Sequence, residues 1–175
     1  MNQAQGTFNT IEDRFCSTNY TILEKIGEGG FGQVYKARQI RTQKLVAIKF
    51  LRLNEAESQQ KKQRSIARFN RECDLVRRLN HPNIVSLIDK GQQGDGLLYA
   101  VYEYVDGETL KDHLDSQGPL LPTDAAEIMA CVLDALAHAH ELGIVHRDIK
   151  PANIMLFKVG AKLHVKILDF GISTL

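Results

Sequence analysis

The first strong pattern in the chain is a series of short apolar runs separated by a glycine-rich turn. Residues 20–26 and 33–38 carry β-branched and aromatic side chains on either side of the turn at residues 27–32, and residues 45–51 form a third apolar run. Such runs are typical of strands. Because strand-forming residues resume directly after the last glycine, where a dinucleotide-binding unit would open a helix, the pattern predicts a three-stranded β-meander.

A helical period follows the meander. Apolar side chains recur at spacings of three and four across residues 66–79, with Glu72 near the middle, and the Asn-His-Pro sequence at residues 80–82 ends the pattern. The preceding residues 54–68 are polar and rich in Gln and Lys. We therefore expect a polar connection that leads into one helix.

Two more apolar runs, residues 84–88 and 97–105, are separated by a polar turn that contains three glycines. This arrangement predicts a second β-hairpin. Together the runs predict a five-stranded antiparallel sheet with the Glu72 helix on one face, which is an α+β fold.

The second half of the chain begins with helical signals. Thr109 predicts an N-cap for a short helix over residues 110–116, and Thr123 predicts an N-cap for a longer helix with an apolar stripe over residues 128–136. A small hairpin over residues 154–168 follows. These elements predict the beginning of a second, mainly helical unit.

The first residues of the chain differ from the rest. Residues 1–18 are polar, rich in Asn, Gln and Thr, and without periodicity. They predict a polar leader that packs only through Phe8, Ile11 and Phe15. We do not expect the function to begin there.

Composition limits the class of protein. The 175 residues are 43% hydrophobic and 25% charged, as in ordinary soluble proteins, and they contain no apolar run long enough to cross a membrane. The net charge of +1 is too small to favour nucleic acid or a membrane as a partner. Three cysteines, Cys16, Cys73 and Cys131, are odd in number and widely spaced, which argues against a disulfide framework or a zinc site and favours a reducing, cytoplasmic compartment.

The candidate chemistry lies in residues 146–153, His-Arg-Asp-Ile-Lys-Pro-Ala-Asn, and in Asp169, which opens an Asp-Phe-Gly triplet. The proline of the first segment lacks an amide proton and disfavours helix at the residue before it, so this segment should be a loop. Two carboxylates, a cation and an amide can orient a hydroxyl, neutralise a phosphoryl group and hold magnesium. Those groups are Asp148, Asp169, Lys150 and Asn153.

Two upstream features add phosphate-binding chemistry. Glycines in the turn at residues 27–32 let backbone amides approach phosphate oxygens without a Cβ in the way, although an ordinary hairpin explains the same turn equally well. Lys49 ends an apolar strand, where an inward lysine needs a carboxylate or a phosphate as a partner. Glu72 is either that carboxylate or an exposed charge on its helix.

In this order and spacing, the glycine turn, Lys49, Glu72, the His-Arg-Asp loop and the Asp-Phe-Gly triplet resemble the protein kinase family over about residues 20 to 175. The Lys-Pro pair of the loop resembles the serine/threonine kinases of that family. The resemblance implies that Asp148 accepts or orients the proton of a substrate hydroxyl and that Lys150 screens the transferred γ-phosphoryl group. It also implies ATP and Mg²⁺ as cofactors, with Mg²⁺ held by Asn153 and Asp169.

The resemblance further implies a nucleotide site with Tyr102 at the gatekeeper position and an ion pair between Lys49 and Glu72 that holds the lysine on the α- and β-phosphates. It places four more residues in a stacked regulatory spine, namely Val76, Leu87, His146 and Phe170. The residues implied to bind the nucleotide are Ile26, Gly27, Glu28, Gly29, Gly30, Phe31, Gly32, Val34, Ala47, Lys49, Glu72, Glu103, Val105 and Met155.

The resemblance divides the chain into the leader (1–18), an N-lobe (19–105) and a partial C-lobe (106–175) that ends before an activation segment. We therefore expect the stripe at residues 128–136 to face water or a partner that covers the incomplete C-lobe. Two functions are compatible with this sequence. One is a kinase that transfers the γ-phosphoryl group of Mg·ATP to a serine or threonine of a protein substrate. The other is a non-catalytic ATP-binding or scaffolding fragment that docks on a partner through the exposed helical face.

Overall fold

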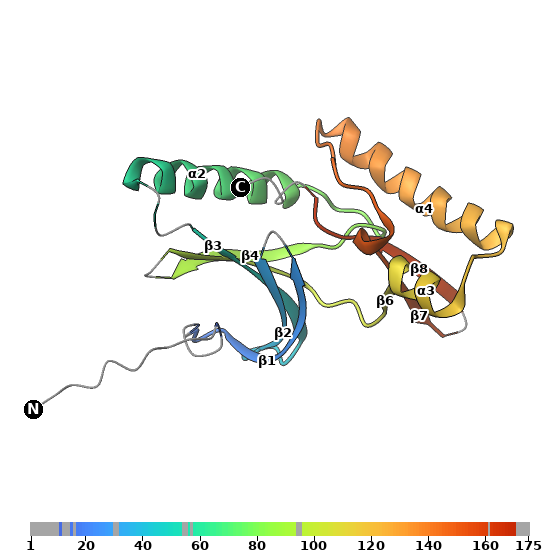
Figure 1. Ribbon diagram of the computed structural model, residues 1–175, viewed down its shortest axis with the longest axis horizontal. Coiled ribbons are helices and arrows are strands. Elements are labelled where there is room, and N and C mark those ends of the chain that lie inside the picture. The colour runs from blue at the N-terminus through green and yellow to red at the C-terminus, as the bar shows by residue number, and fades with distance from the viewer. Residues whose placement is uncertain are drawn as a thin grey trace, which may run out of the picture.

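The computed structural model describes residues 11, 15, 17–29, 32–53, 56, 58–93, 96–160 and 162–170. Five residues considered in the sequence analysis lie outside these ranges: Phe8, Cys16, Gly30, Phe31 and Gly171. Within the described ranges the chain forms a five-stranded sheet with a long helix against it, followed by a smaller sheet and two helices (Figure 1).

The larger sheet has the predicted five strands, all antiparallel, in the order β1-β2-β3-β5-β4. Its strands are β1 (Tyr20–Gly29), β2 (Gly32–Gln39), β3 (Leu45–Arg52), β4 (Leu87–Gln93) and β5 (Leu97–Glu103). The fourth strand begins three residues later than predicted. Ile84 and Val85 pair instead with Ile167, through a parallel bridge and a backbone hydrogen bond of 3.0 Å, and so connect the two sheets.

Helix α2 (Gln59–Val76) lies along one face of the larger sheet, as predicted, but begins earlier than the apolar period indicates (Figure 1). The Ser58 side chain caps it by accepting a hydrogen bond from the backbone N–H of Lys61. Only its last turns bury apolar side chains, at Phe69, Cys73 and Val76. The polar residues before them were predicted as a connection because a surface turn of helix has no buried period to reveal it.

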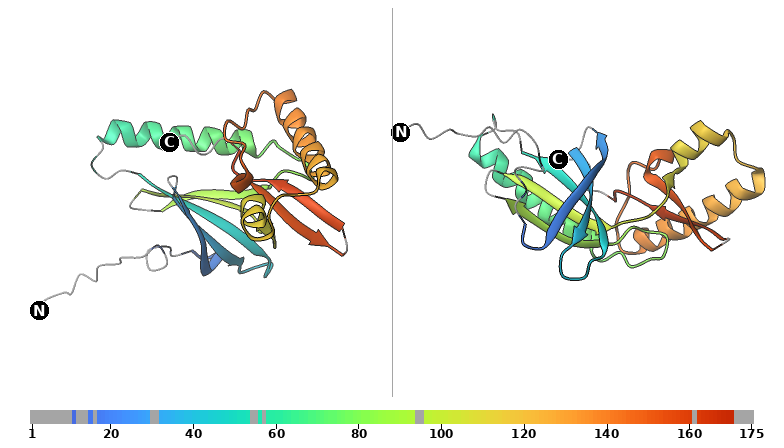
Figure 2. Two further views of the ribbon diagram at one scale, coloured as in Figure 1. Left: turned by 45° about the vertical axis from the view of Figure 1, so that its right-hand side comes forward. Right: turned by 90° about the horizontal axis from the view of Figure 1, so that it is seen from below.

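The second part of the chain forms a three-stranded sheet, β6-β7-β8, flanked by two helices (Figures 1 and 2). Thr109 caps the first of these helices, as predicted, in a reciprocal arrangement with Asp112. The N-cap predicted at Thr123 is wrong, because Pro122 already occupies the first helical position and Leu121 is the capping residue. The elements are β6 (Glu108–Thr109), α3 (Leu110–Gln117), α4 (Pro122–Glu141), the short 3₁₀ helix η1 (Pro151–Asn153), β7 (Ile154–Val159) and β8 (Lys162–Ile167).

The expectation that the apolar stripe of α4 faces water is wrong for half of the stripe. Ile128 and Val132 are fully buried in the main core, whereas Met129 and Leu133 are 44% and 60% exposed. Residues 128–136 span more than two turns, so consecutive apolar residues lie on different faces of the helix. One face of α4 packs within the chain, and the adjacent face carries the exposed side chains.

Two apolar clusters hold the fold together. The larger lies between α2, the sheets and α4, and includes Phe69, Val132 and Phe170. The smaller lies on the other face of the five-stranded sheet, where Ile11 and Phe15 of the leader are buried. The predicted packing of the leader is therefore confirmed for these two residues. None of the helices in the described part of the chain is both long and apolar enough to cross a membrane.

The Phe15 ring contacts Phe50 and Tyr99 edge to face, with ring centroids 4.8 and 5.2 Å apart. Phe15→Ala should lower the free energy of unfolding by about 3 kcal/mol, because it removes a buried aromatic ring and leaves a cavity on the sheet. Urea unfolding followed by far-ultraviolet circular dichroism measures this change. Leu23→Ala, at a side chain that is 45% exposed, is the matched control and should change stability by less than about 0.5 kcal/mol. Equal effects of the two substitutions would show that the leader does not cover the sheet.

Candidate functional site

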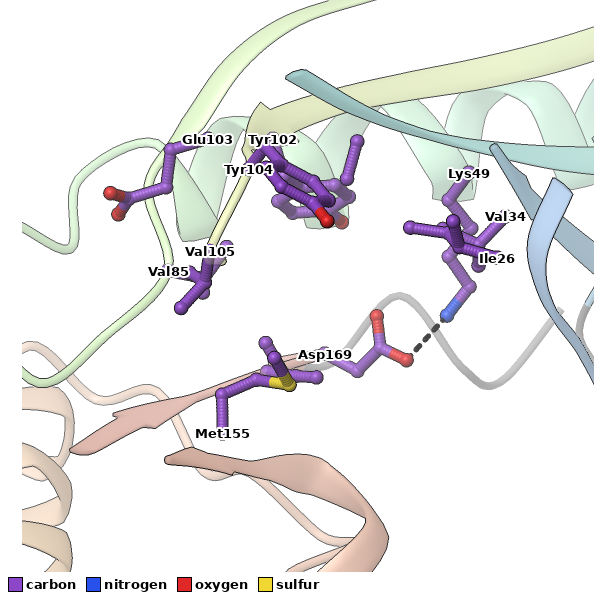
Figure 3. Close-up of a pocket in the computed structure, with 12 residues that line it drawn as sticks. Ile26, Val34, Lys49, Val85, Tyr102, Glu103, Tyr104, Val105, Met155 and Asp169 are labelled. Atoms are coloured by element: carbon purple, nitrogen blue, oxygen red, sulfur yellow. Dashed lines mark ion pairs between the residues drawn. The ribbon is translucent and has the colours of Figure 1, made fainter. Parts of the chain in front are cut away.

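A cleft lies between the five-stranded sheet and the β7–β8 hairpin, and holds about 580 Å³ of space, including the part that opens to solvent. Apolar side chains of β1, β2 and β3 line one wall, and Met155 of β7 lies on the opposite wall (Figure 3). An ion pair between Lys49 and Asp169 closes one end. The lining residues are Ile26, Val34, Ala47, Lys49, Val85, Tyr102, Glu103, Tyr104, Val105, Met155, Leu168 and Asp169.

Lys49 lies on β3 and its side chain points into the cleft, where its Nζ is 2.8 Å from Oδ2 of Asp169 (Figure 3). The lysine is only 5% exposed, so an opposite charge is needed to offset its loss of hydration. The ion pair with Glu72 implied by the family resemblance is not formed. Glu72 instead accepts a hydrogen bond from Nε of Arg68, one helical turn earlier, at 3.0 Å. Its second oxygen, Oε2, is buried without a hydrogen-bond partner among the described residues.

The loop before β7 brings together three of the predicted catalytic side chains. Lys150 forms an ion pair with Asp148 at 2.8 Å, and the amide nitrogen of Asn153 donates to the backbone carbonyl and to Oδ2 of Asp148, at 2.8 and 3.0 Å. The hydrogen bond from Lys150 is the main cause that lowers the pKa of Asp148, and the bond from Asn153 acts in the same direction. At neutral pH Asp148 is therefore an anion that can only accept hydrogen bonds.

His146 connects this loop to the segment that carries Asp169. Its Nδ1 accepts the backbone N–H of Asp148 at 3.2 Å, so the ring proton is on Nε2, which donates to the carbonyl of Leu168 at 2.7 Å. The ring also contacts Phe170 edge to face, at 4.6 Å between centroids. Burial lowers the pKa of His146, which keeps the imidazole neutral and maintains this tautomer.

Two residues of the site hold strained backbone conformations. Arg147 has φ of 68° and Asp169 has φ of 56°, in the left-handed region that costs a non-glycine residue about 1 kcal/mol or more. Both flank hydrogen bonds made by His146. The surrounding contacts therefore hold the loop and the Asp169 segment in conformations that the local sequence does not favour.

The segment after β5 is fixed from behind by a second ion pair. Lys166 of β8 is 2.7 Å from Oε1 of Glu103, which also accepts the backbone N–H of Ser86 at 2.8 Å. The Glu103 carboxylate accordingly points away from Met155 and Asp169 (Figure 3). Only the backbone of Glu103 is left to face a ligand in the cleft.

Seven of the residues implied to bind a nucleotide line the cleft: Ile26, Val34, Ala47, Lys49, Glu103, Val105 and Met155. Four described ones do not, namely Gly27, Glu28, Gly32 and Glu72. The Glu28 side chain pairs instead with Lys25 and Gln33 on the outer surface. Gly32 has a structural reason to be glycine, because its φ is +127° and a Cβ would lie 1.9 Å from the carbonyl oxygen of Phe50.

Sequence reasoning did not single out three residues that line the cleft, Val85, Tyr104 and Leu168. Leu168 directly precedes Asp169, and Tyr104 lies between Glu103 and Val105, so the position of each in the sequence could have indicated a place in the cleft. Val85 offered none, because its apolar character also fits the strand predicted there. Cys73 is fully buried, and burial raises the pKa of its thiol to about 12, so it is not a reactive nucleophile.

Comparison with known proteins identifies relatives of this chain. The family model described as protein kinase domain matches residues 20–175. The chain is 46% identical over 158 residues to serine/threonine-protein kinase PrkC of Bacillus subtilis, and 43% identical over 155 residues to serine/threonine-protein kinase pkn3 of Myxococcus xanthus. These alignments cover 90% and 88% of the chain but only 23% and 28% of the relatives, so the chain spans about a quarter of their length.

A solved structure gives the same result for the fold. The crystal structure of Rad53 in complex with AMP-PNP superposes with a TM-score of 0.75 at 33% sequence identity, over 88% of this chain and 38% of that one.

The Lys49–Asp169 ion pair leads to a prediction about stability. Asp169→Asn should lower the free energy of unfolding by about 2 kcal/mol, because it leaves the charge of a buried lysine uncompensated, and adding Lys49→Met should recover most of the loss. Chemical denaturation of the two single variants and the double variant measures this. The exposed pair of Lys111 and Asp115 on α3 is the control, and its variants should change stability by less than about 0.5 kcal/mol. Additive effects of Asp169→Asn and Lys49→Met would contradict the ion pair.

The lowered pKa of His146 leads to a prediction about pH. The unfolded chain takes up a proton near the ordinary value of 6.5, which the folded chain resists. The contribution of His146 to the free energy of unfolding is therefore fully present above pH 6.5, and it is lost as the pH falls through the lower pKa of the folded state. Between pH 7.5 and 5.5 the melting temperature should fall by a few degrees more in the wild type than in His146→Gln. An equal fall in both proteins would mean that His146 is free to protonate.

Proposed function

The chain belongs to the protein kinase family, and from that premise we propose that it binds Mg·ATP in the cleft and transfers the γ-phosphoryl group to a serine or threonine of a protein substrate. The observation that carries the proposal is that His146 hydrogen-bonds to the segments that carry two groups of charged side chains, one of which lies at the end of the apolar cleft. One is the Lys49–Asp169 pair, and the other is the loop formed by Asp148, Lys150 and Asn153. A phosphoryl group between them would meet cations and anions that are held by separate elements of the fold.

The cleft has the chemistry that a nucleotide requires. Val34 and Ala47 on one wall and Met155 on the other are apolar and suit a flat aromatic base. The backbone of Glu103 and Val105 can exchange hydrogen bonds with the edge of the base, because the Glu103 side chain is held elsewhere by Lys166. Lys49 lies at the end of the cleft where the phosphates would extend.

Asn153 and Asp169 are the residues that would hold Mg²⁺. They offer an amide oxygen and carboxylate oxygens, the ligands that this ion prefers. The side-chain nitrogen of Asn153 donates a hydrogen bond to Asp148, so the side-chain oxygen of Asn153 points away from Asp148. When bound, Mg²⁺ neutralises charge on the phosphates. The ion pair with Lys49 holds the Asp169 carboxylate at the end of the cleft.

Asp148 would receive the substrate hydroxyl. Its pKa is lowered by Lys150, which makes it a weak base, so its main role would be to orient the hydroxyl by accepting its hydrogen bond. The Lys150 side chain is 50% exposed and lies beside Asp148, so it would screen the negative charge of the transferred phosphoryl group. Most of the rate would then come from positioning and electrostatics, as phosphoryl transfer requires.

The cysteines and the α4 helix bear on the compartment and on the alternative function. The described cysteines, Cys73 and Cys131, are free thiols, which supports a reducing, cytoplasmic compartment. The scaffolding alternative requires an exposed apolar stripe on α4, and the burial of Ile128 and Val132 removes half of that stripe. We therefore propose the kinase activity alone. In this proposal residues 19–105 form an N-lobe and residues 106–175 part of a C-lobe, and each contributes one wall of the cleft.

The proposal predicts separate effects of two substitutions. Saturating Mg·ATP should stabilise the wild type by about 2 to 3 kcal/mol at a hundredfold excess over Kd, as seen in a thermal melt, and Lys49→Met should remove most of this gain. Asp148→Asn should keep the ATP-induced stabilisation, because Asp148 does not line the cleft, yet lower phosphate transfer to a serine-rich acceptor protein by about 100-fold or more.

Glu141→Gln is the matched control for the transfer assay, because Glu141 is an exposed carboxylate at the end of α4. It should leave both measurements unchanged. A wild-type melt that is indifferent to Mg·ATP would refute the nucleotide site. Transfer that persists in Asp148→Asn would remove Asp148 from the proposed role.

A further inference from the structure

Two strands that line the cleft lie at the edge of the larger sheet. β1 carries Ile26 and β2 carries Val34, both of which line the cleft, and β1 pairs with β2 alone among the described strands (Figure 1). An edge strand has a neighbour on one side only, so fewer contacts resist its local opening. Side-chain contacts that tie β1 and β2 to the rest of the cleft therefore matter for the position of this wall.

One such contact joins β2 to the segment after β5. The Nζ of Lys36 lies 4.8 Å from the centroid of the Tyr104 ring, in a cation–π arrangement. Lys36 follows Val34 by two residues, and alternate residues of a strand share a face, so Lys36 is on the cleft face of the sheet. Its neighbours in the chain, Tyr35 and Ala37, are buried on the opposite face. Tyr104 itself lines the cleft.

A small side chain leaves room for this contact. Strand β3 separates β2 from β5, and the residue of β3 that pairs with Lys36 is Ala47, which pairs in turn with Tyr102 of β5. Lys36 therefore reaches the Tyr104 ring across β3, on the face where side chains of paired residues are neighbours. The methyl group of Ala47 permits this crossing, whereas a longer side chain would lie in its path.

The edge strand holds the lysine from the other side. Glu24 of β1 is the cross-strand partner of Lys36 and forms an ion pair with it at 3.3 Å. The Lys36 side chain is only 22% exposed, so its contacts are partly shielded from water. Glu24, and after it Tyr104, raise the pKa of Lys36, which is therefore a cation at neutral pH. One ammonium group thus connects β1, β2 and the segment after β5.

We propose that Lys36 is a positioning residue of the nucleotide site, which rests on the Tyr104 ring and holds β1 and β2 in place over the base. This inference rests on the proposed function, because the group that is covered is the base of a nucleotide. The contact joins one wall of the cleft to the segment whose backbone would meet that base. A wall that is held in place opens less often, so the contact lengthens the time for which the nucleotide stays bound.

Stopped-flow displacement of a fluorescent analogue of Mg·ADP measures this time. Lys36→Met should raise the dissociation rate constant by about threefold or more and change the association rate constant by less than about twofold, because affinity differences within one site lie mainly in dissociation. Lys36→Arg should keep the wild-type rates, because a guanidinium also stacks on an aromatic ring. Lys44→Met, at an exposed cation between β2 and β3, is the matched control and should leave both rates unchanged.

The part played by the ring is tested at Tyr104. Tyr104→Phe keeps the aromatic face and should release the analogue within about twofold of the wild-type rate, whereas Tyr104→Leu should release it as fast as Lys36→Met. The double variant Lys36→Met, Tyr104→Leu should be no faster than the faster single variant, because both substitutions break the same contact. Glu24→Gln leaves Lys36 on the ring and should raise the rate by less than about twofold.

Hydrogen exchange of the ligand-free chain reports on the contact without a nucleotide. Lys36→Met should speed exchange of the β1 amides by about threefold or more over the wild type and Lys36→Arg. If the wild type binds no Mg·ADP, the proposed function fails and the residence role fails with it, while the exchange rates still decide whether Lys36 holds β1.

The inference alone is overturned if the wild type binds Mg·ADP and any of three results is found. These are equal dissociation rates for the wild type and Lys36→Met, release from Lys36→Arg as fast as from Lys36→Met, and effects of Lys36→Met and Tyr104→Leu that multiply in the double variant. Thermal melts of all variants verify that they are folded.

Discussion

A buried lysine cannot remain charged without a partner, and the rest of this structure depends on how that requirement is met. Lys49 lies on the central part of the five-stranded sheet, and its counter-ion, Asp169, follows β8 of the smaller sheet. The ion pair therefore bridges the two sheets at the end of the cleft between them. Because the interaction needs both sheets in place, the packing of the core and the chemistry of the site are coupled.

A neutral histidine, His146, holds the segment that carries Asp169 and the neighbouring loop that carries Asp148. His146 accepts from the backbone of Asp148 and donates to the carbonyl of Leu168, next to Asp169. A protonated ring could not accept the first bond, so the site depends on burial to keep the imidazole uncharged. The strained φ angles of Arg147 and Asp169 are maintained by this arrangement. Two carboxylates from separate segments are thus held near each other by one side chain that carries no charge.

Glu72 shows how surface and site are connected. The family resemblance implies a partner in the cleft for this residue in the last part of α2, but the structure pairs it with Arg68 on the same helix. An ion pair within a helix needs no movement of one element relative to another, whereas pairing of Glu72 with Lys49 would require Lys49 to leave Asp169. Arg68, whose side chain is 42% exposed, thus contacts a carboxylate that is 14% exposed and has its second oxygen buried without a partner among the described residues.

The sequence by itself determined the antiparallel sheet, the capped helix at Thr109 and the members of the site, because alternation, glycine turns, capping chemistry and motif order are local properties. It predicted that Lys49 faces inward and that Asp148, Lys150 and Asn153 lie together. Only the tertiary structure decided the start of α2, the burial of Ile128 and Val132, and the partners of Glu72 and Lys49. The burial of Ile128 and Val132 and the pairing of Lys49 with Asp169 depend on contacts between segments distant in sequence. The start of α2 and the partner of Glu72 involve neighbours in the same helix, but the sequence offers other partners too, and the fold decides among them.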